Sequence, residues 1–279
     1  MGVFHVRLGH FRAASRHPGA DRGGGVVWHD GSVTDHAVQP RAERGRPRAA
    51  AAHRPDLSAT EQILDAAAQL FVERGFAATS TRAIADRVGI RQASLYYHFP
   101  SKEQILKVLL MRTVQPSTRV AAYLEAAPEP AVVRLAALIC FDTGQLARSS
   151  YNIGTLYFLP EIRNELLEPF RRERARLRDT YAALIMHSVE ASVRADLGPT
   201  GGGSRSALDY LVDVIFGLVE SVIAIRADRP DEDAAALVST ILYSSLRVLG
   251  HDGDSSPGIT EQAGILLRGM PDAPVVPET

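Results

Sequence analysis

The chain has 279 residues, of which 46% are hydrophobic and 23% charged, with a formal net charge of −1. This length can bury one large core or two adjoining ones. Its single cysteine, Cys140, excludes an intramolecular disulfide, and no run of about twenty apolar residues is present to span a membrane. Because no signal-peptide core follows Met1, we expect a cytoplasmic protein with no membrane partner.

The charge is distributed unevenly along the chain. Residues 1–57 hold nine Arg and five acidic residues, and residues 58–115 hold seven Lys or Arg and five acidic residues. The remainder holds fifteen basic and twenty-two acidic residues. A basic N-terminal portion on an otherwise acidic chain indicates a polyanionic partner for that end.

Residues 1–57 are rich in Arg, Gly, Ala, His and Pro and show no sustained period, so we expect a disordered basic extension. Arg44, Arg46 and Arg48 surround Gly45 and Pro47 in a pattern that resembles the core of an AT-hook, which reads the DNA minor groove. Non-specific attraction to phosphates and a chance match in an Arg-rich segment are the alternatives.

The first predicted helix follows the capping-box pattern of Ser58 and Glu61, and its apolar residues repeat with helical period until Gly75. Thr79 and Ser80 are N-cap residues for a short second helix from Thr81, which Gly89 ends.

A third helix begins at Gln92 and directs Leu95 and Phe99 inward. Two short helices joined by a glycine turn form a helix-turn-helix, whose second helix enters the DNA major groove. A second capping-box pattern at Ser101–Gln104 opens a fourth helix that we expect to reach about Gln115, before Pro116.

Residues 116–279 are predicted to be all-helical. We expect an amphipathic helix from Ala131 to Ala147, an irregular or short helical piece from Ser149 to Pro160, and a long helix from Glu161 to Leu197 that Pro169 kinks. A flexible connector (198–204), two apolar helices (206–226 and 231–249, the second capped by Asp231), and a tail with one short helix (260–267) follow.

Residues 63–106 resemble the N-terminal domain of the tetracycline-repressor (TetR) family. The matching elements are Gly75-Phe76, the Thr81–Ala85 run, Gly89-Ile90, Leu95–Phe99 and Ser101–Glu103. The resemblance implies an all-α fold with a helix-turn-helix domain (58–102), a helical effector-binding and dimerisation domain (103–250) and a C-terminal tail (251–279). It also implies that the protein binds a palindromic double-stranded DNA operator as a homodimeric, ligand-responsive repressor.

Carried over residue by residue, the resemblance assigns DNA contacts to both helices of the motif. Base-edge or groove contacts are expected from the second helix and the start of the third, and phosphate or thymine-methyl contacts from the end of the third and from the start of the fourth. Tyr96 and Tyr97 could instead pack on the first helix, and His98 could bond the backbone. The expected contacts are Thr81, Arg82, Gln92, Ala93, Ser94, Tyr96, Tyr97, His98 and Lys102.

The two C-terminal helices (206–226 and 231–249) are apolar on more than one face, which indicates burial on more than one side. In the resembling family these helices pair with those of a second copy, so we expect a homodimer through them. Complete burial within one subunit is the alternative.

The family places a small-molecule cavity among the middle helices, and we expect a small, mostly apolar effector there. Each candidate could equally be a core residue, and Glu220 in an apolar helix requires a partner: a ligand cation, an Arg or the dimer mate. Bulky substitution at Gly144 is predicted to fill the cavity. The candidate lining residues are Phe141, Gly144, Gln145, Tyr151, Asn152, Tyr157, Phe158, Phe170, Tyr181, Ile185 and Phe216.

The chain carries no P-loop, no GxSxG, no HExxH and no paired CxxC, so we expect no enzyme, cofactor or metal site. The alternative to a ligand-responsive regulator is an architectural DNA-binding protein that lacks an effector cavity.

Overall fold

A computed structural model describes residues 57–197, 206–251 and 253–270. These residues form α-helices and short 3₁₀ helices without a strand, which confirms the predicted all-α class. In chain order the elements are α1 (Ala59–Arg74), α2 (Thr81–Val88), α3 (Gln92–His98), α4 (Lys102–Ala126), α5 (Ala131–Arg148), η1 (Ile153–Phe158), η2 (Pro160–Arg163), η3 (Glu165–Leu167), α6 (Glu168–Ser188), α7 (Ala191–Asp196), α8 (Ala207–Asp228), α9 (Ala234–Val248) and α10 (Ser256–Arg268).

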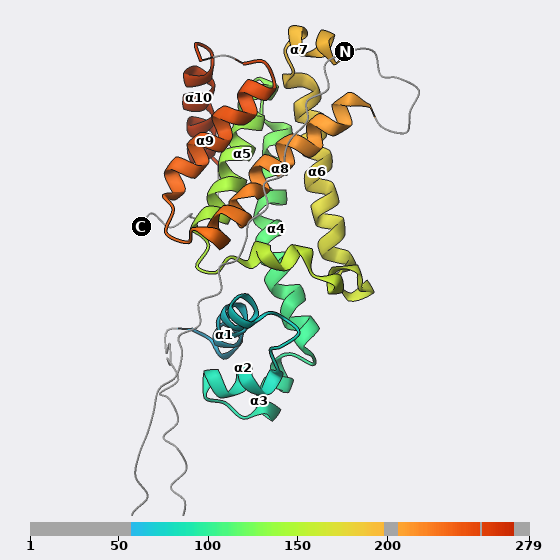
Figure 1. The fold of residues 1–279 in the computed structure, drawn as a ribbon, viewed down its shortest axis with the longest axis vertical. Coiled ribbons are helices and arrows are strands. Elements are labelled where there is room, and N and C mark those ends of the chain that lie inside the picture. The colour runs from blue at the N-terminus through green and yellow to red at the C-terminus, as the bar shows by residue number, and fades with distance from the viewer. Residues whose placement is uncertain (1–56, 198–205, 252, 271–279) are drawn as a thin grey trace, which may run out of the picture. The chain divides into compact units, whose positions relative to one another are not determined.

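Helices α1, α2 and α3 group beside the first turns of α4 and form the helix-turn-helix head (Figure 1). Ile84 of α2 and Leu95 of α3 are fully buried. Phe71, in the last turn of α1, and Phe76, which follows the helix, contact edge to face with ring centroids 5.0 Å apart. This small apolar core fixes the angle between the two helices of the motif.

At each of the two predicted capping boxes, one of the two expected hydrogen bonds forms, the one to the N-cap hydroxyl. The Ser58 hydroxyl accepts from the Glu61 amide, and the Ser101 hydroxyl accepts from the Gln104 amide. The Glu61 carboxylate does not accept from the backbone amide of Ser58, because it pairs with Arg112 of α4. A tertiary ion pair therefore replaces the local second bond of the box.

Helix α4 is longer than the sequence predicted. It continues through Pro116 to Ala126, so the expected end near Gln115 is wrong. Proline removes one backbone donor from a helix interior and normally costs about 3 kcal/mol. The apolar face beyond it, with Val120, Ala121 and Leu124 buried, supplies burial that offsets this cost.

Helix α5 is the central element of the remaining bundle and packs against α4, α6, α8, α9 and α10. Five successive residues, Leu135 to Ile139, have no exposed surface. A helix that is apolar on all sides is buried on all sides. Asp142 and Thr143 are the polar residues that this helix carries into the interior.

The expected long helix from Glu161 to Leu197 is divided. Residues 160–167 form two 3₁₀ helices, α6 begins at Glu168, and a break at Val189 and Glu190 separates α7. Pro169 lies in the first turn of α6, where it starts the helix rather than kinking it. The expected connector (198–204) lies outside the described residues.

The last helices also differ at their ends from the prediction. Ser206 and Asp209 form a reciprocal capping box at the start of α8. Asp233 rather than Asp231 caps α9, because its carboxylate accepts from the Ala235 amide. In the predicted tail, α10 spans Ser256–Arg268 and packs against α5, with Ala263 fully buried.

Candidate DNA interface and interior pocket

The turn between α2 and α3 is built by local chemistry. The Ser80 hydroxyl caps α2 by accepting from the Ala83 amide at 3.1 Å. Gly89 ends α2 in the left-handed conformation, with φ of 81°. Its amide and that of Ile90 both donate to the carbonyl of Ala85. Thr79, the other expected cap, is buried instead and donates its hydroxyl hydrogen to the carbonyls of Leu70 and Gly75.

The expected recognition residues share one property, exposure, apart from Thr81 and Lys102, which are half-buried. Tyr97 is 88% exposed, so it does not pack on α1, the alternative that its sequence allowed. The exposed members are Arg82, Gln92, Ala93, Ser94, Tyr96, Tyr97 and His98. Arg44, Arg46 and Arg48 lie outside the described residues.

A hydrogen-bonded chain links the two helices of the motif on this exposed side. Gln92 Nε2 donates to Thr81 Oγ1 at 2.9 Å, and Thr81 Oγ1 also lies 3.1 Å from the Tyr96 hydroxyl. His98 Nδ1 lies 3.3 Å from the hydroxyl of Thr60 in α1, not on a backbone group. These bonds hold polar side chains in place at the surface that the resemblance assigns to DNA.

Lys102 is occupied within the head. Its ammonium donates to the carbonyl of Phe76 at 2.7 Å and lies 4.2 Å from the centroid of the Phe76 ring. A charged hydrogen bond and a cation–π contact at one side chain indicate a structural role at the junction of α1 and α4.

Replacing Lys102 by Met should therefore lower the free energy of unfolding by about 1–2 kcal/mol, because both contacts to Phe76 are lost. Thermal or urea unfolding of the full chain measures this. Lys107→Met is the matched control, since Lys107 is a half-buried lysine of the same helix. An equal loss in both variants would show that Lys102 acts through general charge alone.

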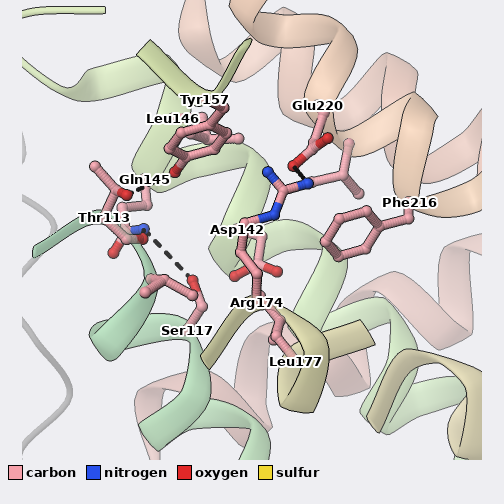
Figure 2. A pocket seen from close by; sticks show the side chains of 12 residues that line it. Thr113, Ser117, Asp142, Gln145, Leu146, Tyr157, Arg174, Leu177, Phe216 and Glu220 are labelled. Carbon is pink, nitrogen blue, oxygen red and sulfur yellow. Dashed lines mark hydrogen bonds and ion pairs between the residues drawn. The ribbon is translucent and has the colours of Figure 1, made fainter. Parts of the chain in front are cut away.

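An interior pocket lies where α4, α5, η1, α6 and α8 meet (Figure 2). Its volume is about 30 Å³, which holds about one water molecule. Its wall is mixed in character, with polar and charged side chains among apolar ones. The lining residues are Thr113, Val114, Ser117, Asp142, Gln145, Leu146, Tyr157, Arg174, Leu177, Phe216, Val219 and Glu220.

A larger hollow of about 550 Å³ lies between α4 and α6. It is open to solvent, and Arg119, Glu173 and Arg176 are among its lining residues. No aromatic side chain lines it, whereas the interior pocket has two. Ligand sites combine apolar or aromatic walls with a few placed polar groups, so the interior pocket is the better candidate.

Three of the predicted lining residues, Gln145, Tyr157 and Phe216, line the interior pocket. The others do not line it: Phe141, Gly144, Tyr151, Asn152, Phe158, Phe170, Tyr181 and Ile185.

The predicted lining residues outside the pocket lie at the surface or in the core, as four examples show. Phe158 is exposed, Asn152 donates to the carbonyl of Ile223, and Phe170 packs on Tyr157 from the core. A Cβ on Gly144 would lie 2.6 Å from the Arg148 guanidinium, and its next neighbour is Val238 of α9. Substitution there would not fill the pocket, so that prediction is wrong.

Asp142 is the most deeply buried charged group of the pocket, with 4% of its surface exposed. Tyr181 donates its hydroxyl hydrogen to Oδ2 at 2.8 Å. Burial raises the pKa of Asp142 to about 6, and the nearby charge of Glu220 adds to this rise. The hydroxyls of Ser117 and Tyr181 oppose it. Among the described residues, Oδ1 accepts no hydrogen bond of ordinary geometry.

Glu220 finds the arginine partner that its sequence position allowed. Arg174 of α6 lies 2.7 Å from its carboxylate (Figure 2). The guanidinium also lies 4.9 Å from the centroid of the Tyr157 ring and 5.5 Å from that of Phe216. The ion pair joins α6 to α8 at the edge of the pocket, where both side chains are partly exposed.

Sequence reasoning missed Thr113, Ser117, Asp142 and Arg174 as lining residues. One signal was available: Asp142 is a lone acid in an apolar helix, the same argument that singled out Glu220. The other three lie on helices whose polar faces give no indication of which side chain turns inward.

The described residues lack two features, a membrane-spanning helix and a metal-binding cluster. No helix among them is long and apolar enough to cross a membrane. Within the same ranges, no group of three or more His, Cys, Asp or Glu side chains is placed to hold a metal ion.

Known proteins resemble this chain both in the helix-turn-helix head and in the helical bundle that follows it. The family described as bacterial regulatory proteins, tetR family, matches residues 63–109. The crystal structure of AmtR of Mycobacterium smegmatis is 41% identical in sequence, with a TM-score of 0.65, and the match covers 78% of this chain and 98% of that chain. The transcriptional repressor KstR2 of Rhodococcus jostii is 28% identical over 196 residues, which are 70% of this chain and 91% of the relative.

A lower identity accompanies the same fold in another solved structure, the ketosteroid transcriptional regulator KstR2 of Mycobacterium tuberculosis. It is 20% identical with a TM-score of 0.54, and the match covers 68% of this chain and 93% of that chain. The match to AmtR over 78% of this chain, the family match over the helix-turn-helix and the exposed recognition helix agree. The chain belongs to the TetR family and is a DNA-binding transcription regulator.

Proposed function

We propose that the protein is a homodimeric repressor that binds a palindromic operator and releases it when a small molecule enters the interior pocket. The observation that carries this proposal is the position of the pocket on α4, the helix that also packs against the head. Repression agrees with the function named for KstR2 of Rhodococcus jostii.

One turn of α4 contacts both the head and the pocket. Arg112 donates two hydrogen bonds, each 2.6 Å long, to the carboxylate of Glu61 in α1. Thr113, the next residue, lines the pocket, where its hydroxyl accepts from Tyr157 at 2.6 Å and its carbonyl accepts from Gln145 at 2.6 Å. A ligand that changes the bonds of Thr113 would thus act on the helical turn that holds α1.

The ligand must prefer one of two arrangements of the head to release DNA. Binding shifts an equilibrium only by the difference in affinity for its two states. In the DNA-binding form of the dimer we expect the two recognition helices to lie about 34 Å apart, one turn of DNA.

The α3 surface is proposed to read base edges through Gln92 and Ser94. Replacing both by Ala should weaken operator binding by about 1–3 kcal/mol per contacted base, because exposed side chains that pair with base edges carry the discrimination. Competition binding at fixed salt, with operator and scrambled DNA, measures this.

The paired control for this experiment is Gln262→Ala with Ser192→Ala, which removes an exposed glutamine and an exposed serine far from α3 in the sequence. Unchanged operator preference in the α3 variant would exclude both residues from base readout.

The arginines at 44, 46 and 48 are proposed to contact DNA through its minor groove or its phosphates. Replacing all three by Gln should lower DNA affinity most at low salt and reduce the slope of affinity against salt concentration by up to about three, since each arginine releases counterions. Titration with operator DNA at several salt concentrations measures this slope. An unchanged slope would mean that these residues do not touch DNA.

The proposal as a whole is tested by selecting the operator from genomic DNA with the purified full chain, and then screening small molecules for release of that fragment. Release by at least one molecule, with specific rather than uniform occupancy of the genome, is the expected result. Uniform occupancy and no release by any molecule would favour the architectural alternative.

A further inference from the structure

The charges that line the interior pocket do not balance. Two carboxylates, those of Asp142 and Glu220, face a single guanidinium, that of Arg174. With both carboxylates ionised, the wall of the pocket has an excess of one negative charge. A buried charge normally requires a partner of opposite sign, and no other cationic side chain lines the pocket within the described residues.

One carboxylate oxygen of the pocket lacks a hydrogen bond of ordinary geometry, although the nearby Ser117 hydroxyl lowers the pKa of the same carboxyl. Oδ1 of Asp142 is buried and accepts no hydrogen bond of ordinary geometry, although Oδ2 is satisfied by Tyr181. Most buried polar atoms in proteins have a partner, so an unpaired oxygen on a carboxylate that lines a pocket needs a separate explanation. Figure 2 shows the carboxylate of Asp142 among the side chains that line the pocket.

The guanidinium of Arg174 lies among aromatic rings and a carboxylate, the groups that also bind organic cations. The Arg174 guanidinium contacts the rings of Tyr157 and Phe216 and pairs with Glu220. Aromatic faces together with a carboxylate are the groups that recognise ammonium and guanidinium ligands. Arg174 is partly exposed on a long flexible side chain, so it can turn outward and leave these groups to a ligand.

The small volume of the pocket requires such a displacement. About 30 Å³ holds one water molecule, and an organic ligand fits only if a side chain moves out. A carboxylate ligand is disfavoured because it would bring a third negative charge to one guanidinium. A neutral ligand that displaced Arg174 would leave both carboxylates without a cation, whereas a cationic ligand takes the place of the displaced guanidinium.

We propose, on the basis of the effector-binding function above, that the pocket takes a small organic cation (an alkylammonium, guanidinium or amidinium). The head group of this ligand replaces the guanidinium of Arg174 beside Glu220, Tyr157 and Phe216, and it donates a hydrogen bond to Oδ1 of Asp142. Displacement of Arg174 breaks its ion pair between α6 and α8, and the ligand contacts Tyr157, whose hydroxyl bonds Thr113 of α4.

Calorimetric titration of the full chain without DNA tests this ligand class. The probes are butylammonium, butylguanidinium and benzamidinium, each compared with a neutral or anionic analogue: butylurea, benzamide and pentanoate. At least one cation should bind at or below about 10 mM and about tenfold more tightly than its analogues. Asp142→Asn, which keeps the shape of the side chain, should weaken that cation by about 10- to 100-fold. Asp196→Asn, at an exposed position of α7, should not weaken it.

A second variant distinguishes a cation site from an anion site. Arg174→Ala should bind the cation more tightly than the parent chain, because the competing guanidinium is gone. An anionic ligand would be weakened by the same change. The proposal is overturned if no cation binds, if analogues bind as tightly as cations, or if Asp142→Asn leaves cation affinity unchanged.

The DNA response is measured separately, so the two proposals can fail independently. A cation that binds with the expected dependence on Asp142 but does not release operator DNA supports the ligand class and contradicts ligand-controlled release. Release of DNA by neutral or anionic molecules alone supports the proposed function and contradicts the ligand class.

Discussion

We expect Val214→Arg to separate the proposed dimer into monomers and to lower the affinity for a two-fold operator by at least about 100-fold. The reason is an exposed stripe on α8, which includes Val214 and Gly217 and is not covered by other parts of the described chain. Val214 is 49% exposed, and a Cβ added at Gly217, one turn further, would meet no atom within 4 Å. Tyr243 of α9 is also exposed. An arginine placed in an apolar interface is left without a partner and costs several kcal/mol.

The loss of DNA affinity follows from the loss of the dimer, since one head contacts only one half-site. Analytical ultracentrifugation gives the oligomeric state, and binding to operator and to half-site DNA gives the affinity. Ile265→Arg is the matched control, because Ile265 is 56% exposed but lies on α10, outside the α8 stripe. A Val214→Arg variant that remains dimeric would mean that copies associate through another surface.

Asp142→Asn should raise the free energy of unfolding by about 1–3 kcal/mol at about pH 7.5. In the folded chain, burial raises the pKa of Asp142 from 3.8 to about 6. At neutral pH the carboxyl is therefore ionised at a cost of at most about 3 kcal/mol. The Asn side chain carries no charge, and its amide oxygen can still accept the hydrogen bond from Tyr181.

The sign of the pH dependence follows from proton binding. Between about pH 4 and pH 6 the folded chain binds more protons at this carboxyl than the unfolded chain does. Its contribution to stability is therefore greatest below about pH 4, falls as the pH rises to about 6, and is constant above that value. The advantage of Asp142→Asn should accordingly grow over the same interval and disappear below it.

Urea unfolding of both proteins at several pH values measures this difference, in which the titrations of other groups, such as Glu220 beside Arg174, largely cancel. Asp196→Asn should show no such pH-dependent gain, since Asp196 is exposed. A variant at Asp142 that is less stable than the parent at neutral pH would show that the folded chain already compensates the charge.

The helix-turn-helix was predictable because its determinants are local. Ser80 caps α2 by bonding a backbone amide three residues away, and Gly89 supplies the left-handed turn that ends it. Leu95 and Phe99 are spaced by one helical turn, so both reach the same core. Exposure of the recognition surface follows from this spacing, since the polar residues of α3 lie on the opposite side.

Helix ends were less predictable where tertiary packing opposed a local preference. Proline at position 116 favours an end, yet α4 continues because its next turns bury an apolar face. The second bond of the capping box at Ser58 was not formed because Glu61 has a stronger partner in Arg112, 51 residues away. Such competitors are absent from any local window of sequence.

The sequence by itself determined the family, the all-α class, the helix-turn-helix and the exposed polar surface of α3, because each depends on residues within a few turns of one another. Only the tertiary structure decided which residues line the interior pocket. Phe141 and Gly144 were plausible lining residues by type, but α5 turns Asp142 and Gln145 into the pocket instead. The pocket combines side chains from five elements, so its volume and charge depend on how those elements pack, which no single helical period specifies.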